Sequence, residues 1–352
     1  MKKVLIIGPY ITNIGGVSIH ISRLMHLLKG DFEFDFIDES RQRSEGVYNI
    51  RSLNPFPYIK KLISADIVHI HSGISILRLF HIIVCLLLFK KTIVTVHRDI
   101  NIEKRKKLTR FFLRRCSKII LVNQVSYDFV TENYKKSNCF LIPAFLPPIL
   151  ENEPELPSEV KMWIGNCRSQ HGFLLSANAS YLAINNGQDL YGLDMCIDAV
   201  EKLNDKGNAQ IFLIFVVADT LKNAPLLQKY KKDIEARNLQ NHILIWEGGL
   251  SFIRLIQQSD VVLRTTNTDG DALTIRESLF FNKPVIASDV VSRPEGTIVF
   301  KTRNLDSLVE AIAKTLNGNT QGKSTITVPN YKQIYTDIYN SCLLYTSDAA
   351  DE

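Results

Sequence analysis

Short apolar runs alternate with segments of helical spacing along most of the chain. Residues 4–7 and 211–217 are continuous apolar runs, typical of strands that are buried on both faces. Residues 17–28 instead repeat apolar side chains at the spacing of one helix face. The same patterns predict strands at 32–37, 66–70, 92–96, 119–122, 173–176, 243–246, 261–264 and 285–287, and helices at 74–89, 103–115, 193–203, 226–237, 252–257, 272–281 and 305–316. Repeated strand–helix units predict parallel, doubly wound α/β sheets.

A proline-rich stretch interrupts this alternation. Residues 143–157 hold five prolines and several glutamates, a composition typical of an interdomain linker. We therefore expect two Rossmann-like domains facing across a cleft, residues 1–145 and 171–328, with a linker at 146–170. A terminal helix is expected at 329–341. Residues 342–352 resemble a translated sequencing adapter, so we expect them to be a non-native tail.

Composition narrows the class of protein. The formal net charge of +6 is too small to indicate nucleic-acid binding, and no recognised binding motif accompanies it, so we expect no nucleic-acid partner. The six cysteines are scattered without a paired spacing, which argues against a disulfide framework or zinc site and favours the cytoplasm. The longest apolar stretch, 80–89, is too short to span a bilayer.

Two candidate sites lie in the first half. Gly15 and Gly16 begin a helix, where the backbone can approach a ligand and free N–H groups can meet an anion. His69 and His71 lie on one face of a strand, and His97 follows the next strand. Because no carboxylate pattern accompanies these histidines, we interpret His69 and His71 as polar lining of the cleft, expect no metal, and take His97 as the candidate ligand contact.

The strongest motif runs from a strand through an acidic loop into a helix. Arg264 ends the strand, the loop carries Asp269-Gly270-Asp271, and Glu277 lies in the following helix. Backbone N–H groups near Ala272 and Leu273 can hold a diphosphate. A loop carboxylate can bind sugar hydroxyls, and a helix carboxylate can bind a ribose diol. Alternatively, the loop acids only cap the helix and Glu277 is a surface residue.

This region resembles the Glu-x7-Glu segment of the family-4 retaining glycosyltransferases, which have the GT-B fold, with Asp269 in place of the first glutamate. The resemblance extends to Gly15-Gly16, the HxHSG at His69 and the strand before His97. It implies that Asp269 contacts the donor sugar, that Glu277 contacts the ribose and that His97 lines the active site.

One feature of that family is missing here. Its members commonly have an arginine and a lysine early in the second domain that hold the donor diphosphate, whereas this chain has Ser176-Ala177-Asn178 and Tyr191-Gly192. Burying a diphosphate without positive charge is costly. We therefore expect Arg264, Arg276 or Arg293 to supply the charge, with Arg264 ranked first. The alternative is that these arginines only pair with Asp269, Asp271 and Glu277.

Two further patterns lie in the acidic loop and in a basic helix. Asp269-Gly270-Asp271 spells the DxD that binds metal in the other major glycosyltransferase fold, but three residues are a weak signal, and we expect no metal and no cofactor. The basic helix Lys104–Arg115 mixes cations with leucine and phenylalanine. It is suited either to an anionic membrane surface or to packing on the sheet with a solvated outer face.

Together these residues predict a retaining, metal-independent glycosyltransferase of hexosyltransferase type that acts in surface polysaccharide synthesis. The expected partners are a UDP- or GDP-linked sugar, a glycan or lipid-linked glycan acceptor, and an anionic membrane surface. The expected location is the cytoplasm, peripherally on the inner face of the plasma membrane. The alternatives are a non-catalytic nucleotide-sugar-binding protein and a nucleotide-sugar epimerase of the same fold.

Overall fold

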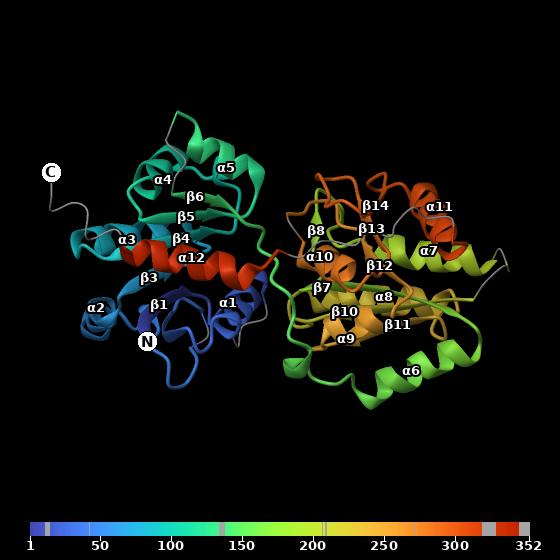
Figure 1. Ribbon diagram of the computed structural model, residues 1–352. Coiled ribbons are helices and arrows are strands. Elements are labelled where there is room, and N and C mark those ends of the chain that lie inside the picture. Colours follow the sequence, from blue (N-terminus) through green and yellow to red (C-terminus); the bar gives the residue numbers. More distant parts are fainter. Residues whose placement is uncertain are drawn as a thin grey trace. The chain divides into compact units, whose positions relative to one another are not determined.

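The computed structural model describes residues 1–10, 15–41, 43–133, 138–205, 207, 210–270, 272–318 and 329–344 (Figure 1). The chain divides into two compact units. The first unit consists of Met1–Leu146 with Val328–Glu352, and the second is Pro147–Thr327. Each unit contains a parallel sheet of six strands, which confirms the expected α/β class with two doubly wound domains.

The sheet of the first unit has the order β2-β1-β3-β4-β5-β6. Its strands are β1 (Lys2–Gly8), β2 (Phe32–Asp38), β3 (Ile67–Ile70), β4 (Lys91–Val96), β5 (Lys118–Leu121) and β6 (Cys139–Leu141), and every neighbouring pair is parallel. From β1 the chain passes first to β2 on one side and then to β3 on the other. The carboxyl ends of β1 and β3 therefore form the switch point at which such sheets bind ligands.

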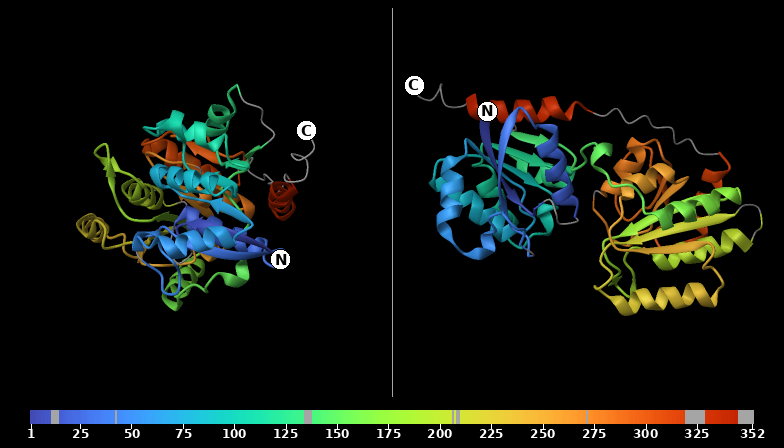
Figure 2. Two further views of the ribbon diagram at one scale, coloured as in Figure 1. Left: turned by 90° about the vertical axis from the view of Figure 1, so that its left-hand side faces the viewer. Right: turned by 90° about the horizontal axis from the view of Figure 1, so that it is seen from below.

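Four helices cover one face of this sheet: α2 (Pro55–Ser64), α3 (Ser75–Leu87), α4 (Lys106–Leu113) and α5 (Gln124–Thr131). Alternate strand residues such as Leu5, Val68 and Val94 bury their side chains against them. The opposite face is covered by α1 (Gly16–Leu27) and by α12 (Tyr331–Leu344), which contacts β3 and β4 (Figures 1 and 2). Both faces of the parallel sheet are thus buried, as such sheets require.

The sheet of the second unit has the order β11-β10-β7-β12-β13-β14. Its strands are β7 (Phe173–Ala179), β10 (Ile211–Val217), β11 (Ile243–Glu247), β12 (Val261–Arg264), β13 (Val285–Ser288) and β14 (Ile298–Phe300), again all parallel. One face packs against α7 (Leu193–Asp205), α8 (Ala224–Ala236) and α11 (Leu305–Leu316). The other packs against α6 (Ser158–Ser169), α9 (Phe252–Gln258) and α10 (Leu273–Phe280). Here the switch point lies between β7 and β12.

Several elements differ from the sequence-based expectation. Residues 158–169, expected within the linker, form α6, because Val160, Ile164 and Cys167 supply an apolar face for the second sheet. The pattern also missed α2, which has two prolines in its first turn and Asn54 as its cap. It missed α5, β6, β14 and the hairpin of β8 (Ile184–Asn185) with β9 (Gln188–Asp189) as well.

The basic helix and the terminal helix both differ from their expected bounds. The basic helix α4 spans Lys106–Leu113 and is shorter than the expected 103–115, and a separate 3-10 turn, Ile100–Ile102, precedes it. The terminal helix runs to Leu344, and Cys342 is buried, so the expected tail at 342–352 begins inside α12. Residues 345–352 lie outside the described part of the chain. Among the described helices, none is long and apolar enough to cross a bilayer.

The terminal helix is tied to the sheet by a buried hydrogen bond. The Tyr339 hydroxyl lies 2.7 Å from His69 Nδ1, although the two residues are 270 positions apart. Tyr339→Phe should leave His69 Nδ1 without this partner and lower the free energy of unfolding of the first unit by about 1–3 kcal/mol, measured by urea unfolding. Tyr335→Phe is the matched control, because the buried Tyr335 hydroxyl has no hydrogen-bond partner in the described part of the chain. Equal losses in both variants would contradict the proposed bond.

Candidate functional site

The loop before α7 packs closely against the end of β12 in the second unit. Gly192 has φ +71°, and a Cβ there would lie 2.4 Å from the Thr265 carbonyl oxygen, so only glycine fits. The Thr265 hydroxyl donates to the Tyr191 carbonyl at 2.7 Å. Asp189 accepts from the backbone N–H groups of Tyr191 and Gly192 at 2.8 and 3.0 Å. The loop before α7 is thereby fixed beside the acidic loop.

Asp269 is the centre of a buried ion cluster in that acidic loop. Arg264 donates to both of its carboxylate oxygens, from Nη2 to Oδ1 at 2.8 Å and from Nε to Oδ2 at 3.0 Å. Arg293 donates to Oδ2 at 2.9 Å, the Thr266 hydroxyl at 3.1 Å, and the Gly270 N–H to Oδ1 at 3.0 Å. These five hydrogen bonds occupy the acceptor capacity of one carboxylate.

The same cluster links β12 to β13. Arg293 follows β13 and donates from Nε to the Ser288 carbonyl at 2.8 Å and from Nη2 to the Ser288 hydroxyl at 3.1 Å. The Ser288 hydroxyl in turn donates to the Thr266 carbonyl at 2.7 Å. The Arg293 side chain is 2% exposed and that of Arg264 is 15% exposed. Arg264 is therefore the arginine of the pair that solvent or a ligand can reach.

Charge in the cluster is unbalanced. Burial acts to raise the pKa of Asp269, but hydrogen bonds and charge from Arg264 and Arg293 outweigh it and lower the pKa to about 2. Two arginines and one carboxylate leave these three residues with a net charge of +1. Of the three arginines expected as phosphate contacts, Arg264 and Arg293 thus do pair with Asp269, as the alternative interpretation held, yet this cluster keeps one positive charge at the switch point.

The helix that follows the loop contributes backbone N–H groups and one buried acid. Ala272 is the N-cap of α10, and its side chain cannot accept from the first turn, which begins at Leu273. Glu277 is 6% exposed, so it is buried in α10 and is not a surface residue. Arg276 is half-buried beside it. Asp271, expected to bind the donor, lies outside the described residues.

The stretch that lacks the expected cations is filled by polar side chains. Residues 176–192 contain neither lysine nor arginine. The Thr274 hydroxyl of α10 donates to Asn178 Oδ1 at 3.3 Å, and the Tyr191 ring lies 5.6 Å from the Arg264 guanidinium. In the sequence, Tyr191 is noted only as a position where the expected cation is missing. Its contact with Arg264 cannot be predicted from the sequence, because that contact depends on the conformation of the loop and not on residue spacing.

The first unit gathers four histidines beside the ends of β3 and β4. His71 Nδ1 lies 3.1 Å from His97 Nε2, and His69 contacts the Thr95 hydroxyl at 2.8 Å. His20 of α1 joins them, with its ring centroid 5.1 Å from that of His97. The structure thus brings together the three histidines expected from the sequence and adds His20, whose position in an amphipathic helix gave no signal.

Burial keeps this cluster uncharged. It lowers the pKa of His20 to about 4, and it lowers the pKa of His69, His71 and His97 well below the usual value, with further lowering from neighbouring charges. His20 Nδ1 lies 2.7 Å from the Ala144 carbonyl. His20 Nε2 and His71 Nε2 are buried without a partner in the described part of the chain. Such nitrogens can bind a hydroxyl of a ligand.

The same histidines offer a metal-ligand set. One ligand atom each from His20, His71 and His97 lie within 4.8 Å of one another. Three neutral imidazoles are a known zinc set. However, His71 and His97 already bond each other, and among the described residues no carboxylate joins the set. We therefore keep the interpretation that these histidines line a polar site.

The glycine pair at the start of α1 is described only in part. Gly15 is the N-cap of α1 in an extended conformation, and the Ser18 hydroxyl donates to its carbonyl at 2.9 Å. Gly16 is the first helical residue. The preceding loop, residues 11–14, lies outside the described part of the chain. The pair remains a prediction for a close ligand approach.

The histidine cluster makes a prediction about pH. The pKa of each of these histidines is lower in the folded state than in the unfolded state. Their contribution to the free energy of unfolding should therefore be complete above pH ~6.5. It should decrease as the pH drops toward ~4, because the unfolded state then binds protons that the folded state does not. His20→Gln should make this decline shallower, measured by urea unfolding with near-ultraviolet circular dichroism. His171→Gln, in the second unit, should leave the decline unchanged. A decline as steep in His20→Gln as in the parent would refute the prediction.

The ion cluster makes a second prediction. Asp269→Asn should destabilise the second unit by about 2 kcal/mol at pH 7, because a carboxyl with a lowered pKa contributes stability above its unfolded value near 4 that is lost as pH falls through about 2. Trp163 and Trp246, both in this unit, make tryptophan fluorescence a local probe of its urea unfolding. Asp306→Asn, which removes an exposed partner of Lys202, is the control and should cost at most about 1 kcal/mol. A cost at pH 7 that persisted at pH 2 would contradict the assignment.

Comparisons with known proteins bear on the fold of the chain and on the family of its second unit. The family model described as glycosyl transferases group 1 matches residues 178–327. No curated protein matches the chain. The chain is similar to Anabaena HepE in complex with UDP and glucose, with a TM-score of 0.67, 12% identity and coverage of 100% of both chains.

Two further solved structures have the same architecture. A glycosyltransferase from Rickettsia africae ESF-5 gives a TM-score of 0.66 at 17% identity, covering 97% of this chain and 96% of the other. A mutant of S. aureus TarM, in complex with Fondaparinux, alpha-GlcNAc-glycerol and UDP, gives 0.62 at 10% identity, covering 97% and 99%. At these identities the likeness shows the fold. The chain therefore has the GT-B fold of these glycosyltransferases, and residues 178–327 match a group 1 glycosyltransferase domain.

Proposed function

We propose that the protein transfers a hexose from a UDP- or GDP-linked donor to a glycan or lipid-linked glycan, with retention of the anomeric configuration, in surface polysaccharide synthesis. The observation that carries this proposal is the +1 ion cluster at the switch point of the second sheet, beside the N-terminus of α10. A nucleotide diphosphate needs both features, a cation and free backbone N–H groups. The group 1 match over the same residues supports it.

The donor would be held by residues of different chemistry. Arg264, the more exposed arginine, would contact the diphosphate together with the N–H groups near Ala272 and Leu273. Glu277 would bind the ribose diol. Asp269 accepts five hydrogen bonds, so we assign it the role of positioning the two arginines. A direct contact between Asp269 and the donor sugar would require that one of these bonds is broken.

The leaving diphosphate would be stabilised electrostatically. Negative charge develops on it as the bond to the sugar breaks, and preorganised cations and N–H groups are worth most at that point. Two guanidinium groups and a helix N-terminus can fulfil this role without a metal ion, so the proposal includes no metal cofactor. Arg293 is too buried to contact the diphosphate directly and would act through its bonds to Asp269 and Ser288.

The histidine cluster suits hydroxyl-bearing sugars. Neutral imidazole both donates and accepts, so His97, with His71 and His20 behind it, can orient a sugar hydroxyl of the donor or acceptor. Gly15 and Gly16 would let that ligand approach the start of α1. The first unit would thereby supply an uncharged binding surface for sugar hydroxyls.

A second candidate function follows from one observation. Residues 176–192 carry no cation, and both buried arginines are already bound to Asp269. If a diphosphate cannot displace Asp269 from Arg264, this arrangement favours a non-catalytic nucleotide-sugar-binding protein. A panel of UDP- and GDP-sugars, first screened by thermal stabilisation and then tested for sugar release and transfer, separates the two functions. Binding without release or transfer would favour the second candidate.

A crossed calorimetric experiment tests the donor site. Arg264→Ala should weaken nucleoside diphosphate binding about ten- to hundred-fold and leave nucleoside binding unchanged, because it removes a charge-assisted contact to phosphate. Arg264→Lys should recover part of the affinity, since lysine cannot make two parallel contacts. Glu277→Gln should weaken nucleoside and nucleoside diphosphate binding alike, because both contain ribose.

The control for this experiment is Arg237→Ala. Arg237 pairs with Asp198, Glu201 and Asp233 at the C-terminal end of α8, away from the carboxyl ends of the strands. Its removal should change neither affinity. Unchanged diphosphate affinity in Arg264→Ala would refute the phosphate role, and unchanged nucleoside affinity in Glu277→Gln would refute the ribose role.

A further inference from the structure

An apolar stripe runs along the outer face of α3. Ile76, Phe80, Ile83 and Leu87 are all exposed, between 36% and 72%, and their spacing of four, three and four residues places them on one side of the helix. The opposite side of α3 packs on the sheet through Ile82 and other buried residues. Because α3 is apolar on its outer side as well as on the side that packs on the sheet, its outer face is suited to binding a protein or a membrane.

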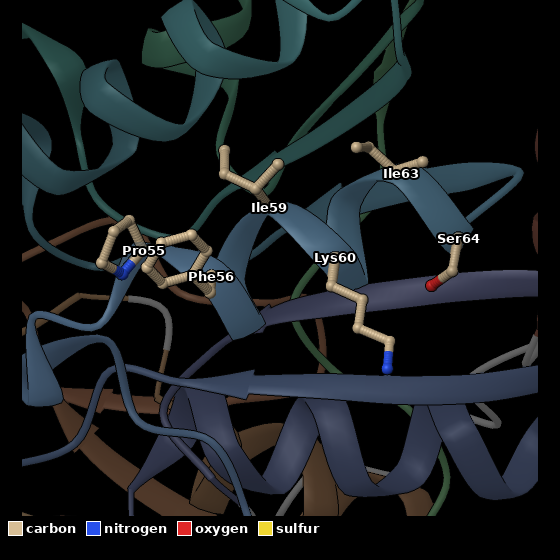
Figure 3. Close-up of a pocket in the computed structure, with 6 residues that line it drawn as sticks. All are labelled: Pro55, Phe56, Ile59, Lys60, Ile63 and Ser64. Carbon is tan, nitrogen blue, oxygen red and sulfur yellow. The ribbon is translucent and has the colours of Figure 1, made fainter.

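The neighbouring helix α2 continues this apolar surface. Phe56 and Ile63 are 83% and 61% exposed, and an open hollow of about 590 Å³ lies against the helix (Figure 3). The hollow is lined by Pro55, Phe56, Ile59, Lys60, Ile63 and Ser64. The two helices touch through Tyr58, whose hydroxyl lies 2.8 Å from His81 Nδ1 and whose ring stacks on Phe80 at 5.8 Å.

On the other side of α3, α4 adds cations to apolar side chains. Leu108 and Phe111 are exposed, and the guanidinium of Arg115 lies 3.4 Å from the Phe111 ring centroid. Helices α3 and α4 are in contact, and Arg78 of α3 forms a buried ion pair with Glu103 just before α4. Side chains of this kind bury their apolar stems in a bilayer while the charged ends reach its surface.

The three segments that build this surface contain no acid. Residues 53–64, 74–91 and 104–118 hold neither aspartate nor glutamate. Their exposed cations are Lys60, Lys104, Arg105, Lys107 and Arg115. Acids beside these segments have partners of their own: Glu103 pairs with Arg78, Glu132 with Arg110 and Asp35 with Lys61, and Asp66 accepts from the Lys3 N–H. An apolar surface whose own segments carry cations and no acid is complementary to an anionic lipid bilayer.

We propose that the outer faces of α2, α3 and α4 bind together to the surface of an anionic membrane. The helices lie on the bilayer and do not cross it, because the 13 residues of α3 extend only ~20 Å, whereas the hydrocarbon core is ~30 Å thick. The apolar stripes of α2 and α3 enter the headgroup boundary, and the cations at α4 meet the lipid phosphates. This surface is independent of the nucleotide site, which lies in the second unit.

Vesicle co-sedimentation of the full chain tests the proposal. The protein should bind vesicles of phosphatidylglycerol with phosphatidylcholine, and binding should fall steeply as salt is raised. Vesicles of phosphatidylcholine alone should bind far less. Lys104→Ala with Lys107→Ala should weaken binding to the anionic vesicles about five-fold for each cation removed, which corresponds to ~1 kcal/mol each. The matched control, Lys229→Ala with Lys232→Ala on α8, should bind as the parent does.

A second pair of variants tests the apolar part. Phe56→Asp with Leu87→Asp should abolish most vesicle binding, while Leu221→Asp, at an equally exposed apolar position of the second unit, should not. Nucleotide binding by calorimetry should stay unchanged in all of these variants, so failure here is distinguishable from failure of the proposed function. Equal binding to neutral and anionic vesicles, or unchanged binding in Phe56→Asp with Leu87→Asp, would overturn the proposal. A dimer of the parent that this double variant abolished would also overturn it, because a second copy would then cover the face.

Discussion

Both sheets of this protein are parallel, and a parallel sheet has two apolar faces that must be covered. Most of the architecture follows from that constraint. In the first unit, α2 to α5 cover one face, but on the other face α1 needs a partner. The end of the chain supplies that partner, because α12 packs on β3 and β4 and its Tyr339 bonds to His69. The first unit is therefore completed only by residues that follow the second unit in sequence.

The two switch points differ in charge: the first is neutral and the second is positive. At the first, burial holds a group of histidines in the neutral form. At the second, Asp269 holds two guanidinium groups and leaves a net positive charge. A neutral donor–acceptor cluster suits sugar hydroxyls, and a cationic cluster beside a helix N-terminus suits a diphosphate. Under the proposed function, the first cluster would bind sugar hydroxyls and the second would bind the diphosphate.

The outer layer of the first unit has a different physical origin. Helices α2 and α3 already bury one side against the sheet, so their exposed phenylalanines, leucines and isoleucines contribute nothing to that core. Exposure of such a surface to water is unfavourable unless it has a partner. The three segments carry cations and no acid, which is why we propose an anionic membrane as that partner. The short basic helix α4, identified from the sequence as a candidate membrane contact, is thus one edge of a larger surface.

The sequence by itself predicted the repeated alternation of strands and helices in both units, and it located β10, β12 and α11 at the observed bounds, because continuous apolar runs and helical spacing are local patterns. It also pointed to Asp269, Glu277 and His97. Elements that begin with prolines or are very short, such as α2 and β14, gave no such pattern. Only the tertiary structure brought Arg293 to Asp269, across 24 residues, and placed His20 beside His97. These contacts depend on which strand ends are neighbours in a sheet, and strand order is set by long-range packing that local periodicity does not encode.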